Sequence, residues 1–401
     1  MTSQGHSINA RTADARTGKV GRGRRFVKGD MDGALFAIVI ALLVIGITMM
    51  FSASYPAALQ DGEKGTFYAF KQMKFAFIGL VAMFVISFVD YHWLQSLAIS
   101  GSAFVVSLIL LGLVLVPGIG KTVNGATRWI EIGSSLQFQP SELMKISIVL
   151  FFSTLIVKNA SRMNTIWYGI VPFLIMLGLV AALMMAEPHL SGTIIICVLA
   201  MMLLFVGGAK PIHLAIVCGV AALALGLVVF VLIKIKGMGY FEVRVSGWLH
   251  PFKEDYMKKE TWQTCQSLIA IGSGGMFGLG LGASRQKYGY LPEAQNDFVF
   301  SILCEEFGVV GAATVILLFC LLIFRGLYVA AKANDKFGML VAVGLTMHIG
   351  LQALLNIAVV SNAIPNTGIS LPFFSYGGTA LVMQLCEMGI LLNISRHAKL
   401  E

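Results

Sequence analysis

Residues 272–311 read GSGGMFGLGLGASRQKYGYLPEAQNDFVFSILCEEFGVVG. In this stretch a glycine-rich, polar loop ends at Asp297, and an apolar run begins directly after it. The pattern predicts that Asp297 lies where a loop enters a membrane helix. A carboxylate that faces lipid at this depth costs about 2–4 kcal/mol, so we expect Asp297 to face a cavity. The alternative is a helix cap, in which Asn296 or Asp297 accepts hydrogen bonds from the first free amides.

The composition of the chain indicates an all-α polytopic membrane protein. Hydrophobic residues make up 57% of the sequence and charged residues 12%, against about 25% charged residues in soluble domains. The apolar residues gather in long runs, as helices that cross a bilayer require. We expect about ten transmembrane helices, near residues 33–54, 72–90, 93–116, 141–157, 166–186, 191–207, 211–233, 298–324, 337–360 and 376–395.

The distribution of Lys and Arg predicts the orientation in the membrane. Residues 1–32 form a basic, Gly- and Arg-rich tail, which we expect to be disordered, cytoplasmic and in contact with anionic lipid rather than nucleic acid. The short loops on the tail's side carry more Lys and Arg than those on the other side. With ten spans both termini are cytoplasmic, and residues 33–401 form one membrane domain.

A long segment, residues 234–297, separates the seventh and eighth spans and is predicted to be a large outer loop. Loops of this length are usually functional or disordered. Its aromatic residues argue against disorder and favour short helices in the membrane interface. The spacing of Gly278, Gly280 and Gly282 is superficially that of a dinucleotide loop. No strand precedes these glycines, so NAD binding is excluded.

A charged pair is predicted at the start of the fourth span. Pro140 suits the first turn of a helix, and Ser141 could cap it. Glu142 and Lys145 are three residues apart, which places them on one helical face in the favourable order. Either this pair only stabilises the first turn, or it lines a polar cavity where Lys145 meets a phosphate or Asp297. The sequence leaves both interpretations open.

Polar groups also recur near the C-terminus. The four-residue spacing of His348, Gln352 and Asn356 predicts a polar stripe on one helix face, acting as interhelical glue or, through His348, as a proton shuttle. Residues 362–379 are rich in proline and glycine and predict a re-entrant turn at the outer face. Ser375 and the glycines after it could offer backbone amides to a phosphate, unless the turn is only structural.

The cations and cysteines of the sequence limit which further binding sites can be expected. Arg128, Arg285 and Lys287 are the outer-face cations best placed to meet an anionic ligand, although surface cations are more often simply solvated. The six cysteines include no CxxC pair and no Cys/His cluster along the sequence. We therefore expect neither a disulfide framework nor a zinc site.

At these residues the chain resembles the SEDS family (shape, elongation, division and sporulation proteins), the FtsW/RodA group. The resemblance runs from the first span to the C-terminus, and the segments that carry it are 125–130, 139–145, 187–188, 286–298, 305–308 and 371–378. The Gln-Lys pair before Tyr-Leu-Pro-Glu-Ala is more similar to the FtsW/SpoVE branch than to the RodA branch. Two departures concern Gln295-Asn296, where the family commonly has His-Thr, and His189, where it commonly has Asp. The second departure puts any role of that acidic pair in doubt.

The resemblance implies a peptidoglycan glycosyltransferase of the bacterial inner membrane. Such an enzyme polymerises lipid II into lipid-linked glycan at the outer face, usually beside a class B penicillin-binding transpeptidase and other division proteins. The family's essential aspartate matches Asp297, and its membrane Glu and Lys match Glu142 and Lys145. We expect Asp297 to be the general base of an inverting displacement, in which no second carboxylate serves as nucleophile. Lys145, Arg128 or Lys287, with Mg²⁺ or Mn²⁺ as an optional cofactor, would stabilise the leaving diphosphate.

Three alternatives compete with a polymerase for cell division. A flippase for lipid II would use the same multispan architecture and the same buried polar groups. A scaffold of the division machinery would use the charges as glue, and an elongation or sporulation paralogue would catalyse the same reaction in another process. The gathering of candidate base and cations on the outer face favours the enzyme.

Overall fold

The computed structural model describes residues 30–123, 126–133, 136–236, 247–253 and 261–398. The basic tail at residues 1–29 lies outside this range, so its expected disorder stays a prediction. The helices are α1 (Gly33–Gln60), α2 (Phe67–Phe88), α3 (Leu97–Val114), α4 (Pro140–Lys158), α5 (Ile166–Gly169), α6 (Val171–Ala186), α7 (Leu190–Gly207), α8 (Pro211–Lys236), α11 (Trp262–Ser273), α12 (Val299–Ala331), α13 (Lys336–Val360) and α14 (Gly378–His397), with 3₁₀ turns η1 (Tyr91–Gln95) and η2 (Ala160–Arg162).

The chain is the all-α membrane protein that its composition predicts. Within the described residues, eight helices are long and apolar enough to cross a bilayer: α1, α2, α3, α4, α7, α12, α13 and α14. Two shorter apolar helices, α6 and the first half of α8, fall at the fifth and seventh predicted spans. Each predicted span thus overlaps a helix, while a count of ten crossings stays a prediction.

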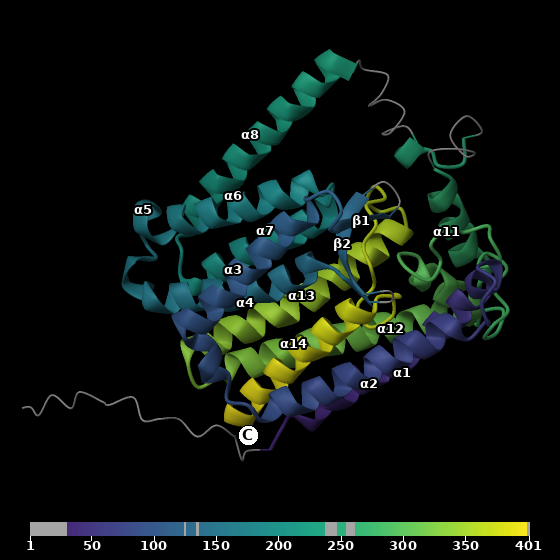
Figure 1. Ribbon diagram of the computed structural model, residues 1–401, viewed down its shortest axis with the longest axis horizontal. Coiled ribbons are helices and arrows are strands. Elements are labelled where there is room, and N and C mark those ends of the chain that lie inside the picture. The colour runs from purple at the N-terminus through teal and green to yellow at the C-terminus, as the bar shows by residue number, and fades with distance from the viewer. Residues whose placement is uncertain (1–29, 124–125, 134–135, 237–246, 254–260, 399–401) are drawn as a thin grey trace, which may run out of the picture.

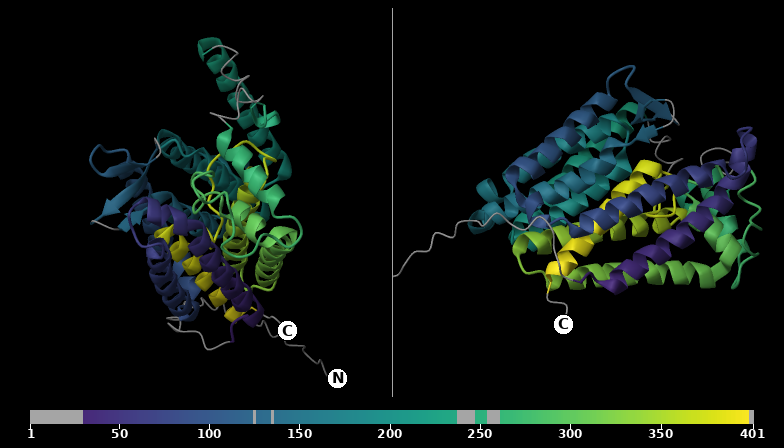
Figure 2. Two further views of the ribbon diagram at one scale, coloured as in Figure 1. Left: turned by 90° about the vertical axis from the view of Figure 1, so that its right-hand side faces the viewer. Right: turned by 60° about the horizontal axis from the view of Figure 1, so that its bottom comes forward.

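The bundle is built around α4 and α13, the two most enclosed long helices with α14. Helices α3, α7 and α13 pack against α4, and α12 and α14 pack against α13. Figure 2 shows α14, in yellow, lying beside α2, with which it makes the most extensive helix contact. Helix α8 follows α7 and leans away from the bundle (Figure 1). The functional residues predicted on α4, α13 and α14 therefore come from the enclosed centre of the bundle.

A break inside α12 anchors the long loop. Gly308 has φ +65°, which only glycine adopts easily, and a Cβ there would lie 2.5 Å from the Gly278 amide nitrogen. The break frees carbonyls of α12, and the amides of Leu279 and Gly280 donate to Glu305 O and Glu306 O at 3.0 and 2.9 Å. The glycine-rich stretch at 278–282 is therefore a structural element that docks on a broken helix turn.

A small antiparallel sheet departs from the all-helical prediction. Its order is β1-β2-β3, formed by Gly120–Val123, Ala126–Ile132 and Leu136–Phe138. The segment between α3 and α4 is too polar for a span, and in β2 only Ile130, Glu131 and Ile132 alternate between apolar and polar residues, as in a strand with one face covered. Thr379 on α14 donates a hydrogen bond of 3.0 Å to Gln137 O, so the sheet lies over the N-terminal end of α14.

Candidate functional site

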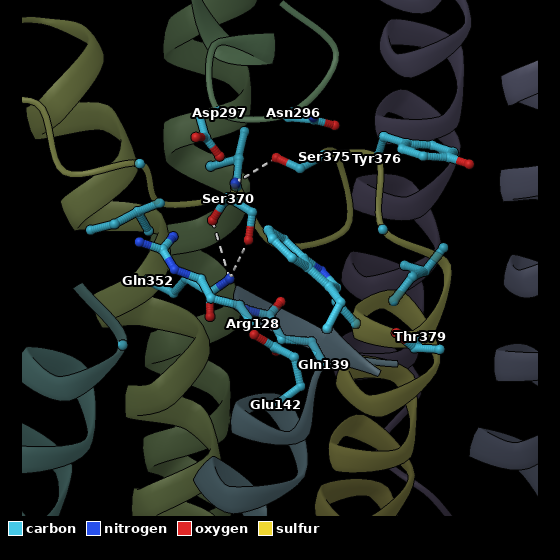
Figure 3. A pocket seen from close by; sticks show the side chains of 18 of the residues that line it. Arg128, Gln139, Glu142, Asn296, Asp297, Gln352, Ser370, Ser375, Tyr376 and Thr379 are labelled. Atoms are coloured by element: carbon cyan, nitrogen blue, oxygen red, sulfur yellow. Dashed lines mark hydrogen bonds between the residues drawn. The ribbon is translucent and has the colours of Figure 1, made fainter. Parts of the chain in front are cut away.

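A cavity of about 350 Å³ lies where the sheet, the α13–α14 connection and the start of α12 meet. Five of the six predicted site residues line it, and they come from four different parts of the chain: Arg128 on β2, Glu142 and Lys145 on α4, Asp297 before α12, and Ser375 before α14. Figure 3 shows Asp297 at one end of this group and Glu142 with Gln139 at the other. The fold thus gathers groups that the sequence separates by long apolar helices.

Asp297 is positioned through its backbone and not as a helix cap. The N-cap of α12 is Phe298, without a side-chain cap bond, so the alternative in which Asn296 or Asp297 caps this helix is wrong. The carbonyl of Asp297 accepts a 2.7 Å hydrogen bond from Asn356 Nδ2. A Cβ on Gly368, which has φ +63°, would lie 3.1 Å from Asp297 Oδ2. The re-entrant segment therefore comes close to the carboxylate, which faces the cavity.

The electrostatic surroundings of Asp297 bring its pKa closer to neutral pH, which suits a proton acceptor. Desolvation by burial and the negative charge of Glu293 raise the pKa of Asp297 to about 6, against the opposing effect of the Arg128 guanidinium. Glu293 lines the same cavity and has φ +57°, an uncommon conformation for a residue with a side chain. A carboxyl group with such a pKa is ionised at pH 7 and still basic enough to accept a proton.

The polar stripe on α13 holds this site together. Gln352 donates from Nε2 to Ser370 O and Oγ at 3.1 Å, and its Oε1 accepts from Lys145 Nζ at 2.9 Å. Asn356 donates to Ile369 O at 2.6 Å as well as to Asp297 O. The predicted role of the stripe in linking helices is confirmed. Its hydrogen bonds also hold the segment between α13 and α14 against Asp297.

The third member of the stripe, His348, lies deeper. Its Nδ1 is 2.8 Å from Glu387 Oε2 on α14, and its Nε2 is 3.1 Å from Gln352 Oε1. The residue is fully buried and is not among those that line the cavity. Among the described residues, His348 therefore links α13 to α14.

Glu142 and Lys145 form the predicted ion pair, with 2.8 Å between Lys145 Nζ and Glu142 Oε1. Both side chains are buried, and both line the cavity. Pro140 opens α4 as predicted, but the N-cap is Gln139 and it makes no side-chain cap bond; Ser141 is not the cap. The two interpretations of the pair therefore hold together, because it stabilises the start of α4 and also forms the floor of a polar cavity.

Arg128 crosses from the sheet to the α6–α7 connection. Its Nη2 donates to Pro188 O. Burial lowers the pKa of the Arg128 guanidinium, and the nearby carboxyl groups of Asp297 and Glu187 oppose this effect. Glu187 is 1% exposed, and neither of its carboxylate oxygens has a hydrogen-bond partner among the described residues. Burial raises the pKa of Glu187 to about 8, against the Arg128 charge, and burial lowers the pKa of His189 to about 3. Both groups are thus neutral at pH 7, which leaves the Arg128 charge for the cavity.

Ser375 reaches the cavity as part of a turn. Its hydroxyl accepts from the Leu371 amide at 2.7 Å, and its carbonyl accepts from Gln72 Nε2 at 3.1 Å. The Gly377 amide is also bonded, at 3.3 Å to Gln72 Oε1. Helix α14 begins at Gly378 without a side-chain cap, and Gly378 and Thr379 line the cavity. The first turn of α14, directly after Ser375, therefore borders the cavity.

Lys287 does not reach the cavity. Its Nζ lies 2.8 Å from Glu306 Oε1, 2.9 Å from Ser52 Oγ and 2.8 Å from Gly282 O, and the side chain is 2% exposed. It joins the loop before α12 to α1 and to α12 itself. The structure thus separates Lys287 from the five residues above, because the broken turn of α12 pulls its loop into the protein. Arg285 also lies outside the cavity lining.

One cation of the site went unnoticed in the sequence. Lys71, on the first turns of α2, lines the cavity beside Phe75. Lys64 and Lys74 line an adjoining groove of about 740 Å³ along the same face of α2. The sequence carries a signal for it, because Lys71 and Lys74 are three residues apart on one face of α2, at the polar end of a span.

Fold and site together define a class: a polytopic helical membrane protein with a polar cavity at one end, built from a carboxylate of raised pKa and several cations. Residues 33–400 match the family model of the FtsW/RodA/SpoVE cell cycle proteins. The chain belongs to this family.

Curated relatives and solved structures agree with this membership. The chain is 38% identical to the stage V sporulation protein E of Bacillus subtilis (strain 168), over 93% of this chain and 99% of that protein. It is 36% identical to the probable peptidoglycan glycosyltransferase FtsW of Geobacter sp. (strain M18), over 94% and 99%. Its fold is similar to a chain of a peptidoglycan synthase complex that coordinates polymerization and crosslinking (TM-score 0.73, 25% identity, 91% of this chain and 98% of that one). It is also similar to the rod shape determining protein RodA of Thermus thermophilus (TM-score 0.64, 26% identity, 92% and 98%).

Proposed function

We propose that this chain polymerises lipid II with Asp297 as the general base. The class of activity rests on relatives along almost the whole chain, several of which bear the name peptidoglycan glycosyltransferase FtsW. The chain is accordingly a peptidoglycan glycosyltransferase of the cytoplasmic membrane, and a role in cell division fits these relatives. The observation that carries the assignment of the base is the placement of Asp297, with its pKa near 6, at the rim of a cationic cavity.

The reaction needs a base on one side and charge stabilisation on the other. Asp297 accepts the proton of the acceptor sugar hydroxyl as that oxygen attacks the anomeric carbon of the donor. A base in this position typically contributes about 10²–10⁴-fold to the rate. The bond to the lipid diphosphate breaks from the opposite face, so the anomeric configuration inverts. A second carboxylate nucleophile is unnecessary, because the base activates the acceptor directly.

The leaving diphosphate carries negative charge and needs cations rather than an acid. Arg128 uses one donor on Pro188 O and retains others in its fork. Lys145 uses two donors, on Glu142 and Gln352, and has three in total. The first amides of α14, beside Ser375, add a helix N-terminus to the same cavity. These groups would bind the diphosphate more strongly as charge develops on it.

A divalent cation is compatible with the outer end of the cavity. Asp297 and Glu293 both line it, and carboxylate oxygens are the ligands that Mg²⁺ and Mn²⁺ prefer. Bound there, such an ion would add positive charge next to the diphosphate.

We further propose that the cavity faces the outside of the cell, with both termini in the cytoplasm, and that a class B penicillin-binding transpeptidase and other division proteins bind this chain. A solved neighbour of similar fold belongs to a complex described as coordinating polymerization and crosslinking. The excess of Lys and Arg in short loops on the side of the basic tail supports the orientation.

The decisive experiment is polymerisation of labelled lipid II by the purified protein. Wild type should yield glycan ladders, with its transpeptidase partner and a divalent cation present. Asp297→Asn, which keeps the size of the side chain, should reduce the rate by at least about 10²-fold. Glu131→Gln, which removes an exposed carboxylate outside the cavity, serves as the control for a loss of negative charge.

Retained activity of Asp297→Asn would remove this residue from the role of base. If wild type makes no polymer under any condition but moves labelled lipid II across vesicle membranes, a flippase replaces the enzyme.

A further inference from the structure

At the end of the bundle opposite the cavity, two histidines and an aspartate converge from distant parts of the chain. Asp90 and His92 lie in the turn between α2 and α3, and His397 is the last residue of α14. One ligand atom of each, a carboxylate oxygen or a ring nitrogen, lies within 4.8 Å of the others. From these residues we infer a transition-metal site of the zinc type, with the ligands Asp90, His92 and His397.

The inner nitrogens of both rings face the same carboxylate oxygen. His92 Nδ1 is 2.6 Å and His397 Nε2 is 3.7 Å from Asp90 Oδ1. Neighbouring ligand atoms around a tetrahedral zinc ion, at about 2.0–2.2 Å from the metal, are about 3.3–3.6 Å apart. The His92–Asp90 contact would have to open to this separation, whereas the His397–Asp90 distance is already close to it.

The outer nitrogens of both rings face acceptors, as in established metal sites. His397 Nδ1 lies 3.1 Å from Asn393 O, a backbone carbonyl that can only accept a hydrogen bond. This bond fixes the proton on Nδ1 and leaves the Nε2 lone pair directed at Asp90. His92 Nε2 lies 3.4 Å from Asp335 Oδ2. Metal-binding histidines almost always donate their second N–H to a carboxylate or a backbone carbonyl. His397 makes such a hydrogen bond, and His92 has a carboxylate within ion-pair distance in the corresponding position.

The surroundings hold the ligands in place and leave a route for an ion. His92 stacks on Tyr91 at 4.2 Å between ring centroids, and Tyr91 is buried and bonded to Asp335. The His92 side chain is 42% exposed, whereas those of Asp90 and His397 are 17% and 21% exposed. Two imidazoles and one carboxylate suit Zn²⁺ better than Mg²⁺ or Ca²⁺, which prefer oxygen ligands. With three protein ligands, the fourth position would hold water.

A metal ion at this place would fix two helices that also line the cavity. It would join the C-terminal end of α14 to the turn after α2. At their other ends these helices supply Gly378, Thr379 and Lys71 to the cavity. Since Asp90 and His397 are separated by most of the sequence, no local Cys/His pattern signals the site.

The test is direct metal binding by the full chain in detergent. Metals are removed with a chelator, and the protein is dialysed against micromolar Zn²⁺. We then expect one zinc ion per chain by inductively coupled plasma mass spectrometry. His92→Gln and His397→Gln should each lose this zinc, and His250→Gln, an exposed histidine of the outer segment, should keep it. Co²⁺ in place of Zn²⁺ should give the visible absorption bands of a tetrahedral site in wild type only.

A fourth variant tests the arrangement around the ligands. Asp335→Asn keeps the cap of α13, where Asp335 Oδ1 accepts from the Gly338 amide at 2.8 Å. It weakens the acceptor next to His92 Nε2, so zinc affinity should fall about 10–100-fold. Since Asp335 Oδ2 also accepts from the Tyr91 hydroxyl, Tyr91→Phe is the matched control: it removes that bond, leaves Asp335 charged and should keep the zinc affinity. The proposal is overturned if wild type retains no more zinc than the His92→Gln/His397→Gln double variant. The cluster would then only link the turn after α2 to the ends of α13 and α14.

Discussion

At the scale of single residues, the site depends on how differently the protein treats its carboxylates. Glu187 is buried with a pKa raised to about 8, and Asp297 has a pKa raised only to about 6. At pH 7 the first is neutral and the second is ionised. Of these two, Asp297 combines negative charge with access to the cavity, which is the combination that a general base requires.

The pH dependence of polymerisation should therefore report Asp297. The base must be ionised, so kcat/KM should be constant above pH 7 and fall tenfold per pH unit well below pH 6. Arg128 lowers the pKa of Asp297, so Arg128→Gln should move the acidic limb to higher pH. Lys121→Gln, on the exposed edge of the sheet, should leave the midpoint unchanged. Initial rates between pH 5 and 8.5 decide the matter, and a profile that stays flat down to pH 5 would speak against this base.

The same carboxylate should lower the stability of the fold. The pKa of Asp297 is raised in the folded state, so the folded state binds the proton more tightly than the unfolded chain does. Stability is thus lost as pH rises from about 4 through 6, and it stays lower above that range. Asp297→Asn removes this loss, so it should raise the melting temperature at pH 7.5 and leave it nearly unchanged at pH 4. A destabilised Asp297→Asn at pH 7.5 would contradict the desolvation of this group.

At the scale of elements, the ion pair on α4 is a further test. Lys145→Met leaves Glu142 buried without its cation, which should cost about 3–5 kcal/mol of unfolding free energy. The double variant Glu142→Gln/Lys145→Met removes both charges and should cost clearly less. The exposed pair Lys121–Glu131 is the matched control, since Lys121→Met should cost less than about 1 kcal/mol. Denaturant midpoints in detergent measure all three, and equal costs for single and double variants would contradict the argument.

The ion pair between Lys287 and Glu306, which joins the loop before α12 to α12 itself, gives a separate prediction. Lys287→Met leaves Glu306 without its cation at 0% exposure, so stability should fall by about 3–5 kcal/mol and proteases should cut the loop sooner. Arg285→Met, on an exposed side chain of the same loop, is the control. If Lys287 instead binds the diphosphate, Lys287→Met would keep its melting temperature and raise KM alone.

The comparison of these elements shows what the sequence can predict. Spans follow from the length of apolar runs, because each helix must bury its own backbone polar groups in lipid. The stripe on α13 and the pair on α4 follow from helical spacing. The burial of Lys287 against α12 cannot be predicted in this way. It depends on the break at Gly308, which arises from the packing of the loop on the helix. The sheet was missed for a similar reason: its strands pair across short turns in a segment without helical periodicity.

At the scale of the whole molecule, the cavity and the histidine cluster lie at opposite ends of α14. The orientation of the protein therefore decides which of them meets lipid-linked substrate and which meets the metals of the cytoplasm. Polymerisation outside the membrane requires the cavity end, with the outer loop and the sheet, to face outward. The C-terminal end of α14 then faces the cytoplasm (Figure 1).

Fusions to alkaline phosphatase, which is active only outside the cytoplasm, test this orientation. A fusion after His250, in the outer segment, should be active, and a fusion after His397 should be inactive. A fusion after Gln60, at the end of α1, should also be active, because α1 crosses the membrane once from a cytoplasmic tail. Comparable expression of each fusion, measured by immunoblot, is the control. An active fusion after His397 with an inactive one after His250 would place Asp297 in the cytoplasm, where the cavity could not extend glycan strands outside the cell.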